Sequence, residues 1–442
     1  MLTKLDRIAE IAKERPKEKF TSLMHLIDED MLKYCHHELD RNKATGADKV
    51  TKDEYEEKLD DNIKELLIIM KNHQYRPQPV KRVYIPKAES NKMRPLGIPG
   101  HEDKIVQSAL NKILIPIYEQ DFLDCSFGFR PKRGCHDAIK ILDVYISRRN
   151  TNYIVDADIK GFFDHVNHEW LIKFLKERIA DNNILRLVGK FLASGIIEEG
   201  KFFKTYEGTP QGGIISPILG NIYLHYALDL WFEKVVKKYC KGKAYLVRYA
   251  DDFVACFEFK EDAEAYYKAL INRLAKFNLE VAEDKTRIIH FGRNAYKDFK
   301  NGKGPKPPTF DFLGFTHYCS HRQDGSFRVK RKTSAKKFRN SLKRCSLWLK
   351  KNRILPIKEL MKRLIIKLKG YFRYYGITDN SNNINIYRDK VRYLLFKWLN
   401  RRSQRKSFNW DKFILFMERY RLPKAKIYVN IFELKKEISY IL

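Results

Sequence analysis

The pattern of apolar and polar positions predicts helices over the first 80 residues. Thr51 and Glu54 have the spacing of a capping box, in which two side chains satisfy backbone N–H groups at the start of a helix. Apolar residues then recur at intervals of three and four, which places them on one helical face. They are Tyr55, Leu59, Ile63, Leu66, Leu67 and Met70. Residues 1–80 therefore form a predicted helical N-terminal extension, and simple packing explains this apolar face.

Strand patterns replace the helical pattern after residue 78. PVKRVYIPK and MRPLGIP alternate apolar and polar residues, and the polar AESNK between them predicts a hairpin turn. An amphipathic helix is expected from Glu102 to about Gln120. Further on, YIVDADI at residues 153–159 predicts a buried strand. LVRYADDFVACF at residues 246–257 predicts a second hairpin with two carboxylates at its turn.

Three basic helices are predicted in the C-terminal part, over residues 333–351, 356–375 and 386–399. Aromatic residues among their lysines and arginines are expected mainly to pack a core. Together these patterns indicate an α+β protein. The predicted parts are a helical extension at 1–80, a mixed region at 81–318, an α-helical region at 319–400 and a short basic tail at 401–442.

Positive charge is concentrated toward the C-terminus. The formal net charge of the 442 residues is +32, and residues 321–442 hold 34 Lys or Arg against 8 Asp or Glu. A solvated helical face normally mixes both signs, so this excess indicates a polyanionic partner. Nucleic acid fits best because phosphates attract cationic surfaces whatever the base sequence, and an anionic membrane surface is the alternative.

Cysteine usage and hydropathy predict a soluble protein of a reducing compartment, with the cytoplasm as the expected location. The seven cysteines are scattered and form no CxxC pair, so neither a zinc ribbon nor a disulfide framework is indicated. The N-terminal residues contain no apolar run of signal-peptide length. No window reaches the length of a membrane span, so no membrane partner is expected.

Carboxylates on two predicted strands supply the candidate chemistry. Asp158, with Asp156 two positions earlier, interrupts a buried strand, and Asp251 and Asp252 occupy the turn of the second hairpin. An acidic turn alone is most often exposed to solvent and has no special role. Acidic residues within a buried strand break the apolar pattern, and metal binding explains them. Three carboxylates on neighbouring strands can hold two cations about 3.5 to 4 Å apart, an arrangement that transfers phosphoryl groups. Mg²⁺ is the expected ion, with Mn²⁺ as an alternative.

Further motifs suit phosphate or nucleic acid. Lys87 and Arg94 flank the AESNK turn and can reach a triphosphate, although on their own an exposed, solubilising turn is the simpler interpretation. The loop FGFRPKRG mixes aromatic rings with Arg130 and Arg133, which suits base stacking and phosphate contact. In YEGTPQGG, glycines surround Gln211 and allow the backbone to approach a ligand closely.

The order of these motifs resembles one known family. RPLGIP, FGFRPKRGCHDA, DADIKGFFDHVNH, GTPQGGIISPILGNIYL, YADD, EDKTR and FLGF occur in the order and spacing of bacterial group II intron reverse transcriptases, the intron-encoded maturases. The resemblance covers about residues 51–423. It implies a right-hand polymerase fold, with fingers and palm built on an antiparallel sheet in residues 81–318, an α-helical thumb in 319–400 and a nucleic-acid-binding tail in 401–442.

The resemblance also implies roles for single residues. Asp158, Asp251 and Asp252 match the catalytic, metal-binding aspartates, and the carbonyl of Ile159 lies beside them as a further metal ligand. Phe163 matches the aromatic ring that excludes a ribose 2′-hydroxyl. The other implied nucleotide contacts are Lys87, Arg94, Gln211 and Lys285, of which Lys285 matches a lysine that protonates the departing pyrophosphate. The expected nucleic-acid contacts are Arg130, Arg133, Arg401, Arg402, Arg405 and Lys406.

The function implied by the resemblance is RNA-directed DNA polymerisation, in which a primer 3′-hydroxyl is extended with dNTPs. Binding of group II intron RNA in splicing and retrohoming is also implied. The expected partners are an RNA template, structured intron RNA, and a DNA primer or target, and the oligomeric state is open. Many relatives end in an HNH endonuclease with paired cysteines, which this chain does not show, so second-strand cleavage is not expected. An RNA-binding splicing cofactor and a domesticated reverse transcriptase in phage defence or DNA repair are the alternatives.

Overall fold

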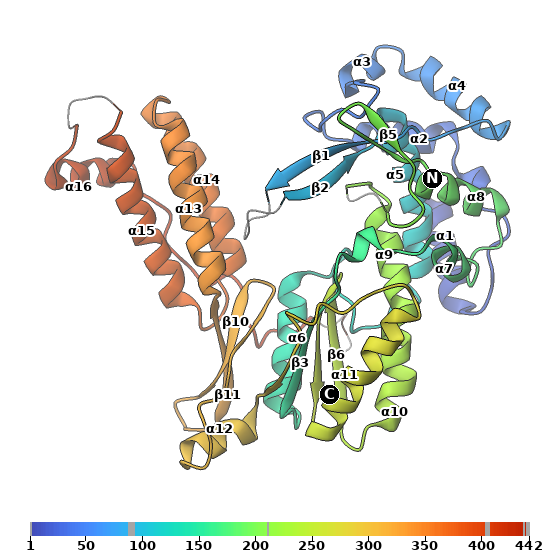
Figure 1. Ribbon diagram of the computed structural model, residues 1–442. Coiled ribbons are helices and arrows are strands. Elements are labelled where there is room, and N and C mark those ends of the chain that lie inside the picture. Colours follow the sequence, from blue (N-terminus) through green and yellow to red (C-terminus); the bar gives the residue numbers. More distant parts are fainter. Residues whose placement is uncertain (1, 87–92, 210–211, 403–406, 436–437, 439–442) are drawn as a thin grey trace. The chain divides into compact units, whose positions relative to one another are not determined.

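The structure is a computed structural model that describes residues 2–86, 93–209, 212–402, 407–435 and 438. The chain divides into two compact units. Figure 1 labels their helices and strands. Unit 1 comprises Met1–Gly134, Val155–Ala255 and Glu261–Arg287, and unit 2 comprises Cys135–Ile154, Cys256–Lys260 and Ile288–Leu442. Within the described ranges, no helix has both the length and the apolar character needed to cross a membrane.

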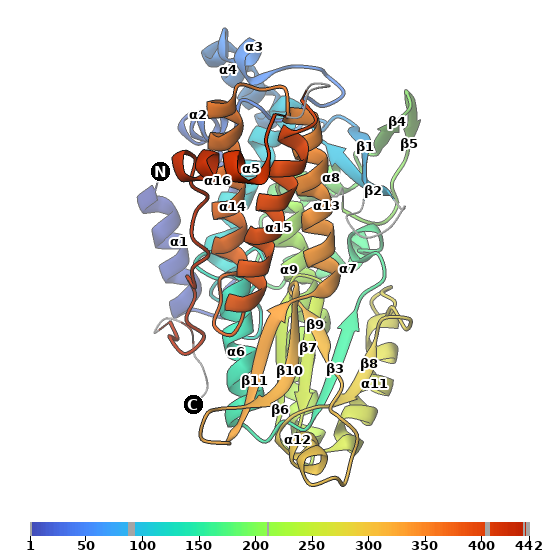
Figure 2. The ribbon, with the colours of Figure 1, turned by 90° about the vertical axis from the view of Figure 1, so that its left-hand side faces the viewer.

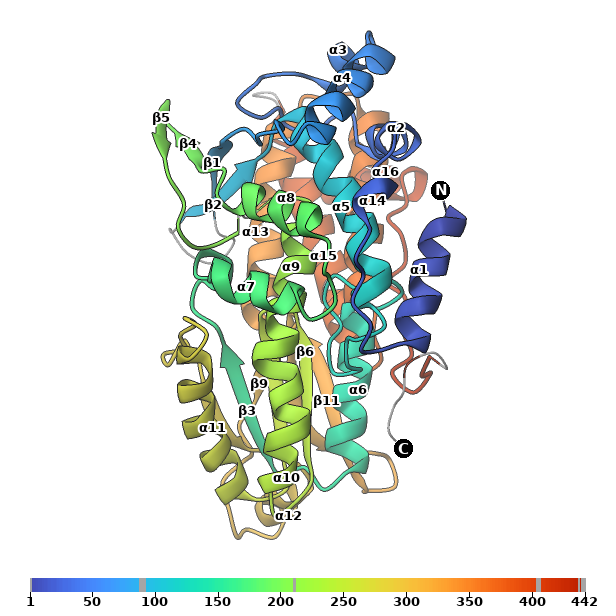
Figure 3. The ribbon, with the colours of Figure 1, turned by 90° about the vertical axis from the view of Figure 1, so that its right-hand side faces the viewer.

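Helix α5 (His101–Tyr118) is the centre of the N-terminal helices of unit 1. Most of its side chains are buried, and α1 (Leu2–Glu14) packs along it (Figure 3). The predicted capping box at Thr51 is present. The single helix predicted after it is wrong, because the non-helical backbone of Lys58 separates α3 from α4. The remaining helical elements of this region are η1 (Met24–Leu26), α2 (Glu29–Glu38), α3 (Lys52–Glu56) and α4 (Leu59–Lys71).

A four-stranded sheet follows in the order β2-β1-β4-β5. β1 (Val80–Pro86) and β2 (Met93–Ile98) pair antiparallel, which confirms the strands of the first predicted hairpin. β4 (Ile196–Glu198) pairs with β1 in parallel and with β5 (Lys201–Phe203) antiparallel. The sheet therefore joins two segments that lie far apart in the sequence.

A second four-stranded sheet, in the order β6-β7-β3-β8, contains the acidic strands. Its strands are β3 (Tyr153–Asp158), β6 (Ala244–Tyr249), β7 (Asp252–Phe257) and β8 (Arg287–His290), so the predicted buried strand and second hairpin are both confirmed. Nearly all side chains of β6 and β7 are buried, as expected when both faces of a strand are covered. The other elements of unit 1 are η2 (Phe162–Asp164), α7 (His168–Leu175), α8 (Asn182–Leu192), α9 (Ser216–Leu224), η3 (His225–Asp229), η4 (Phe232–Val236), α10 (Lys237–Tyr239) and α11 (Lys260–Ala275).

Unit 2 begins with α6 (Cys135–Arg148) and contains a three-stranded sheet in the order β11-β10-β9. β10 (Phe315–His321) and β11 (Phe327–Thr333) form an antiparallel hairpin that leads into the C-terminal helices (Figure 2). The sequence patterns did not predict β11, because residues 319–400 were expected to form an α-helical region; the first part of that region is a strand. The remaining elements here are α12 (Arg293–Lys300) and β9 (Phe310–Phe312).

The C-terminal helices confirm the three predicted basic helices and add a fourth. They are α13 (Ala335–Asn352), α14 (Ile357–Tyr375), α15 (Ser381–Leu399) and α16 (Trp410–Arg419). α13, α14 and α15 lie side by side (Figure 2). These helices share one apolar core that includes Phe372, Leu395 and Phe413, so aromatic residues do pack the interior. α15 begins at Ser381, earlier than the predicted Ile386.

Candidate active site at the β6–β7 turn

The turn between β6 and β7 presents two adjacent carboxylates. β6 ends at Tyr249 and β7 begins at Asp252, so Ala250 and Asp251 form a two-residue turn. Ala250 has a φ of +58°, the left-handed conformation that such hairpin turns require at their first position. A β-carbon on Gly128 would lie 2.4 Å from the Ala250 nitrogen. Only glycine permits this close approach, so the backbone at residue 128 can pack directly against the turn.

A fully buried arginine holds the same turn. Arg248 Nε and Nη2 donate to the two carboxylate oxygens of Asp229 at 2.7 and 2.6 Å. Its other N–H groups reach Ser126 Oγ, Asn221 Oδ1 and the Ala250 carbonyl at 2.8, 3.1 and 3.0 Å. All five guanidinium donors are thereby used. The network fastens the turn to α9 and to η3, whose last residue is Asp229.

Asp158 lies at the end of β3 and pairs with a lysine. Lys285 Nζ is 2.5 Å from Asp158 Oδ2, and this hydrogen bond together with the attraction of the carboxylate raises the pKa of Lys285. Asp156, on the same strand, pairs with Arg287 at 3.5 Å. Each of these two acids therefore faces a cation that lies shortly before or within β8.

Strand pairing orients the backbone carbonyl of Ile159. The residues directly before and after Ile159 each form one backbone hydrogen bond with the segment around Val281, and the two N···O distances are 2.9 and 2.8 Å. Ile159 bridges Val281 between these two bonds, so its own N–H and C=O point away from that segment. β7 pairs with the opposite edge of β3 in the same sheet. The Ile159 carbonyl therefore points toward the strand that begins with Asp252.

Burial raises the pKa of Asp251, and the negative charge of Asp158 adds to the effect. Arg94 and Arg248 act in the opposite direction by attracting the carboxylate. Lys285 interacts with both aspartates. The structure thus brings together Asp158, Asp251, Arg94 and Lys285, all of which belong to unit 1.

The donor set of this site fits hard divalent cations. Asp158, Asp251 and Asp252 could offer carboxylate oxygens, and Ile159 could offer a backbone carbonyl, which are the ligands that Mg²⁺ prefers. The positively charged ammonium group of Lys285 is paired with the Asp158 carboxylate, as a metal cation would be.

Phe163 lines a cavity of about 290 Å³ in unit 1, together with Gly97 of β2 and Thr209. Its ring packs edge-on against Phe162, with 5.0 Å between centroids. A β-carbon on Gly220 would lie 3.1 Å from both rings. The position of the Phe163 ring therefore depends on the absence of a side chain at residue 220.

Arg130 requires a correction. Its side chain is 2 % exposed, donates to both carboxylate oxygens of Glu119 and reaches backbone carbonyls nearby. The predicted nucleic-acid contact of Arg130 is wrong because internal partners take up its guanidinium. Arg133 is 11 % exposed and pairs with Asp124 at 2.5 Å, so it too offers little surface to a nucleic acid.

The basic tail is described in part. Arg401 is exposed, and its guanidinium lies 5.5 Å from the centre of the Trp398 ring. Arg402 is partly buried and donates to the Leu355 carbonyl at 3.0 Å. Four of the predicted site residues lie outside the described residues: Lys87, Gln211, Arg405 and Lys406.

Sequence reasoning missed the Arg248 network. A signal was present, because a charged residue within the apolar run before YADD must find a buried partner. Its partner Asp229 lies 19 residues upstream, in a helical stretch without a recognisable motif. Only the folded structure identifies this pair.

Two family models match the chain. Residues 85–317 match the model described as reverse transcriptase (RNA-dependent DNA polymerase), and residues 335–413 match the group II intron maturase-specific domain. Proteins of the first family share the right-hand polymerase fold, and they generally use divalent metal ions. The acidic hairpin and the mixed sheets followed by helices thus define a polymerase of this class.

The chain is also similar to proteins that have names. The chain is 29 % identical over 479 residues to the group II intron-encoded protein LtrA of Lactococcus lactis subsp. cremoris, covering 89 % of this chain and 76 % of that protein. It is 34 % identical over 275 residues to protein YkfC of Escherichia coli (strain K12), covering 55 % of this chain and 72 % of that protein. The chain belongs to the group II intron reverse transcriptase and maturase family. The predicted family, fold class and enzymatic activity are therefore confirmed, and both matched domains imply binding of nucleic acid.

Proposed function

We propose that Asp158, Asp251, Asp252 and the Ile159 carbonyl hold two Mg²⁺ ions, with Mn²⁺ as an alternative. The position of Asp158 and Asp251 at the ends of adjacent strands of one sheet supports this proposal most directly. Bound ions of this kind supply Lewis acidity to an attacking hydroxyl and to the phosphate that it attacks. The reaction is attack of a primer 3′-hydroxyl on the α-phosphate of a dNTP, directed by an RNA template.

The neighbouring residues bind and select the nucleotide. Arg94 lies in β2 and interacts with Asp251, so its guanidinium can bind the triphosphate while Lys87 and Gln211 add further contacts. Phe163 excludes a 2′-hydroxyl by occupying the space beneath the sugar. Lys285 keeps its proton because its pKa is raised, and it can release that proton to the departing pyrophosphate.

The basic helices of unit 2 are the proposed surface for structured intron RNA. α13 and α14 pack apolar residues inward and keep lysines exposed, among them Lys343, Lys350, Lys362 and Lys369. The tail would extend this surface through Arg401, Arg402, Arg405 and Lys406. In this proposal residues 81–318 form fingers and palm, residues 319–400 the thumb and residues 401–442 the tail, after the extension at 1–80. The protein acts in the cytoplasm on a DNA primer or target.

A primer-extension assay with matched variants tests the proposal. The full chain is supplied with a DNA primer on an RNA template, dNTPs and Mg²⁺, beside Asp251→Ala/Asp252→Ala. Asp60→Ala/Asp61→Ala is the control, because it removes two adjacent aspartates that are exposed on α4. We expect extension by the wild type and by the control but none by the first variant, with RNA binding unchanged in all three.

Two outcomes contradict this assignment. Undiminished extension by Asp251→Ala/Asp252→Ala would show that the carboxylates lie elsewhere. Absence of extension by the wild type, with tight RNA binding retained, would instead indicate a protein that acts primarily as an RNA-binding splicing cofactor.

A further inference from the structure

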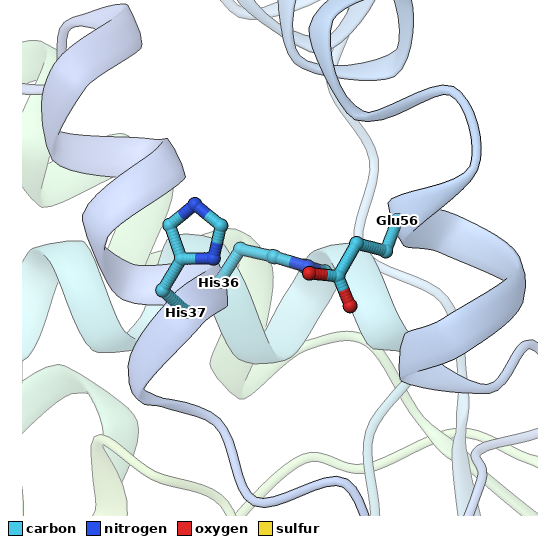
Figure 4. Close-up of side chains that lie close together, drawn as sticks. All are labelled: His36, His37 and Glu56. Atoms are coloured by element: carbon cyan, nitrogen blue, oxygen red, sulfur yellow. The ribbon is translucent and has the colours of Figure 1, made fainter.

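A second group of metal-binding side chains joins two N-terminal helices of unit 1. His36 and His37 lie in the last turn of α2, and Glu56 is the last residue of α3. One ligand atom from each residue lies within 4.8 Å of the other two. Figure 4 shows the His36 imidazole and the Glu56 carboxylate pointing toward one another, with His37 beside them.

His36 supplies a buried nitrogen that lacks a partner. The residue is 0 % exposed, and its Nε2 accepts or donates no hydrogen bond among the described residues. Its Nδ1 lies 3.1 Å from Nε2 of His101, so one ring donates to the other. When Nδ1 of His36 is the donor, Nε2 retains a lone pair inside the protein. An unpaired buried acceptor destabilises the folded state, and a bound cation would remove that cost.

The contact with His101 also sets the orientation of the ring. His36 is 0 % exposed and His101 is 4 % exposed, so the protein encloses both imidazoles. A neutral imidazole is the form that binds metal ions, and donation from its second nitrogen to an outer partner is the usual arrangement around a metal-bound histidine.

We propose that His36, His37 and Glu56 bind one Zn²⁺ ion, with water as the fourth ligand. Two imidazole nitrogens and one carboxylate oxygen suit Zn²⁺, whereas Mg²⁺ prefers oxygen ligands throughout. Tetrahedral coordination at about 2.0–2.1 Å places ligand atoms roughly 3.4 Å apart, so separations of up to 4.8 Å would have to shorten when the ion binds. The ion would tie α2 to α3 and so restrain residues 39–51, which form neither helix nor strand.

Neighbouring cations limit the affinity of this site. Arg41 Nη2 lies 3.0 Å from Glu56 Oε2, and Arg41 is 64 % exposed. Lys52 Nζ donates to the carbonyls of His37 and Leu39 at 2.9 and 2.8 Å. A carboxylate can bind arginine through one oxygen and a metal ion through the other. Removing the charge of Arg41 should therefore tighten Zn²⁺ binding.

Zinc titration of the full chain against a chromogenic chelator tests the proposal. We expect one Zn²⁺ per chain, and each of the variants His37→Ala and Glu56→Gln should weaken binding at least about tenfold. Arg41→Gln should strengthen it. His25→Ala is the matched control, because His25 is an exposed histidine of the same region that lies outside the cluster.

Additional readouts keep the test independent of polymerase activity. Zn²⁺ should raise the melting temperature of the wild type and of His25→Ala but not of His37→Ala, since an ion that binds only the folded state stabilises it. The Asp251→Ala/Asp252→Ala variant should retain the zinc site. Failure of the wild type to bind Zn²⁺, or equal binding by the wild type, His37→Ala and Glu56→Gln, would overturn the proposal.

Discussion

Breaking the buried pair of Arg248 and Asp229 should disable the polymerase site through its hairpin turn. Both side chains are 0 % exposed. Arg248→Met leaves the Asp229 carboxylate inside the protein without its counter-charge, which costs about 3–5 kcal/mol in buried ion pairs. For a unit of this size, that loss lowers the melting temperature by roughly 6–20 °C. The variant should therefore unfold well below the wild type.

A double variant separates stability from positioning. Arg248→Met with Asp229→Leu replaces the ion pair by apolar side chains, a change that is often close to neutral in stability. The Ala250 carbonyl nevertheless loses its donor, and the turn that presents Asp251 loses an anchor. A displacement of about 1 Å at a reacting centre can reduce the rate about a hundredfold. We expect near-wild-type melting together with much slower primer extension.

Thermal melting followed by circular dichroism and single-nucleotide primer extension measure the two effects. Arg331→Met is the matched control, because Arg331 is also fully buried and pairs with Asp143, but within unit 2. It should lower stability while preserving extension at temperatures where the protein remains folded. A wild-type rate in the double variant would refute the positioning argument, and an unchanged melting temperature in Arg248→Met would refute the stability argument.

Three further substitutions test other parts of the molecule. Burial lowers the pKa of His317 to about 3, against about 6.5 in the unfolded chain, so the free energy of unfolding falls as the pH drops below 6.5. His317→Phe should reduce the loss of unfolding free energy between pH 7 and pH 5 by about 2 kcal/mol, as measured by urea titration. Gly128→Ala should abolish extension without changing RNA affinity in filter binding, because its β-carbon would meet the Ala250 nitrogen. Phe163→Val should raise incorporation of rNTPs relative to dNTPs about tenfold to a hundredfold in a competition assay, and an unchanged ratio would exclude the proposed selection.

The strands and turns of the site were predictable because their signals are local. The alternation before and after AESNK gives β1 and β2, and the acidic turn of YADD gives the β6–β7 hairpin. Local signals also explain the basic helices of unit 2, whose apolar residues recur at helical spacing. The strand and turn patterns already singled out Asp158 and Asp251, and the family resemblance added Lys285, which the fold brings into the same site.

Features that depend on distant partners were not predictable in this way. The break between α3 and α4 falls in a stretch with no proline or glycine, so tertiary packing and not local preference determines it. The strand β11 is basic, yet Arg331 is buried against Asp143 of α6, far away in the sequence. Neither the break nor the strand has a pattern that a local reading of the chain can recognise.

The same distinction governs which basic residues can contact RNA. Arg130, Arg248 and Arg331 add to the positive charge of the chain, but each lies buried against an internal carboxylate. A buried and paired guanidinium contributes to folding and little to the attraction of a polyanion. Exposed lysines such as Lys343 and Lys369 keep their charge at the surface, where it can attract phosphates. Net charge therefore predicts the class of partner, whereas the internal pairing of each arginine determines where that partner can bind.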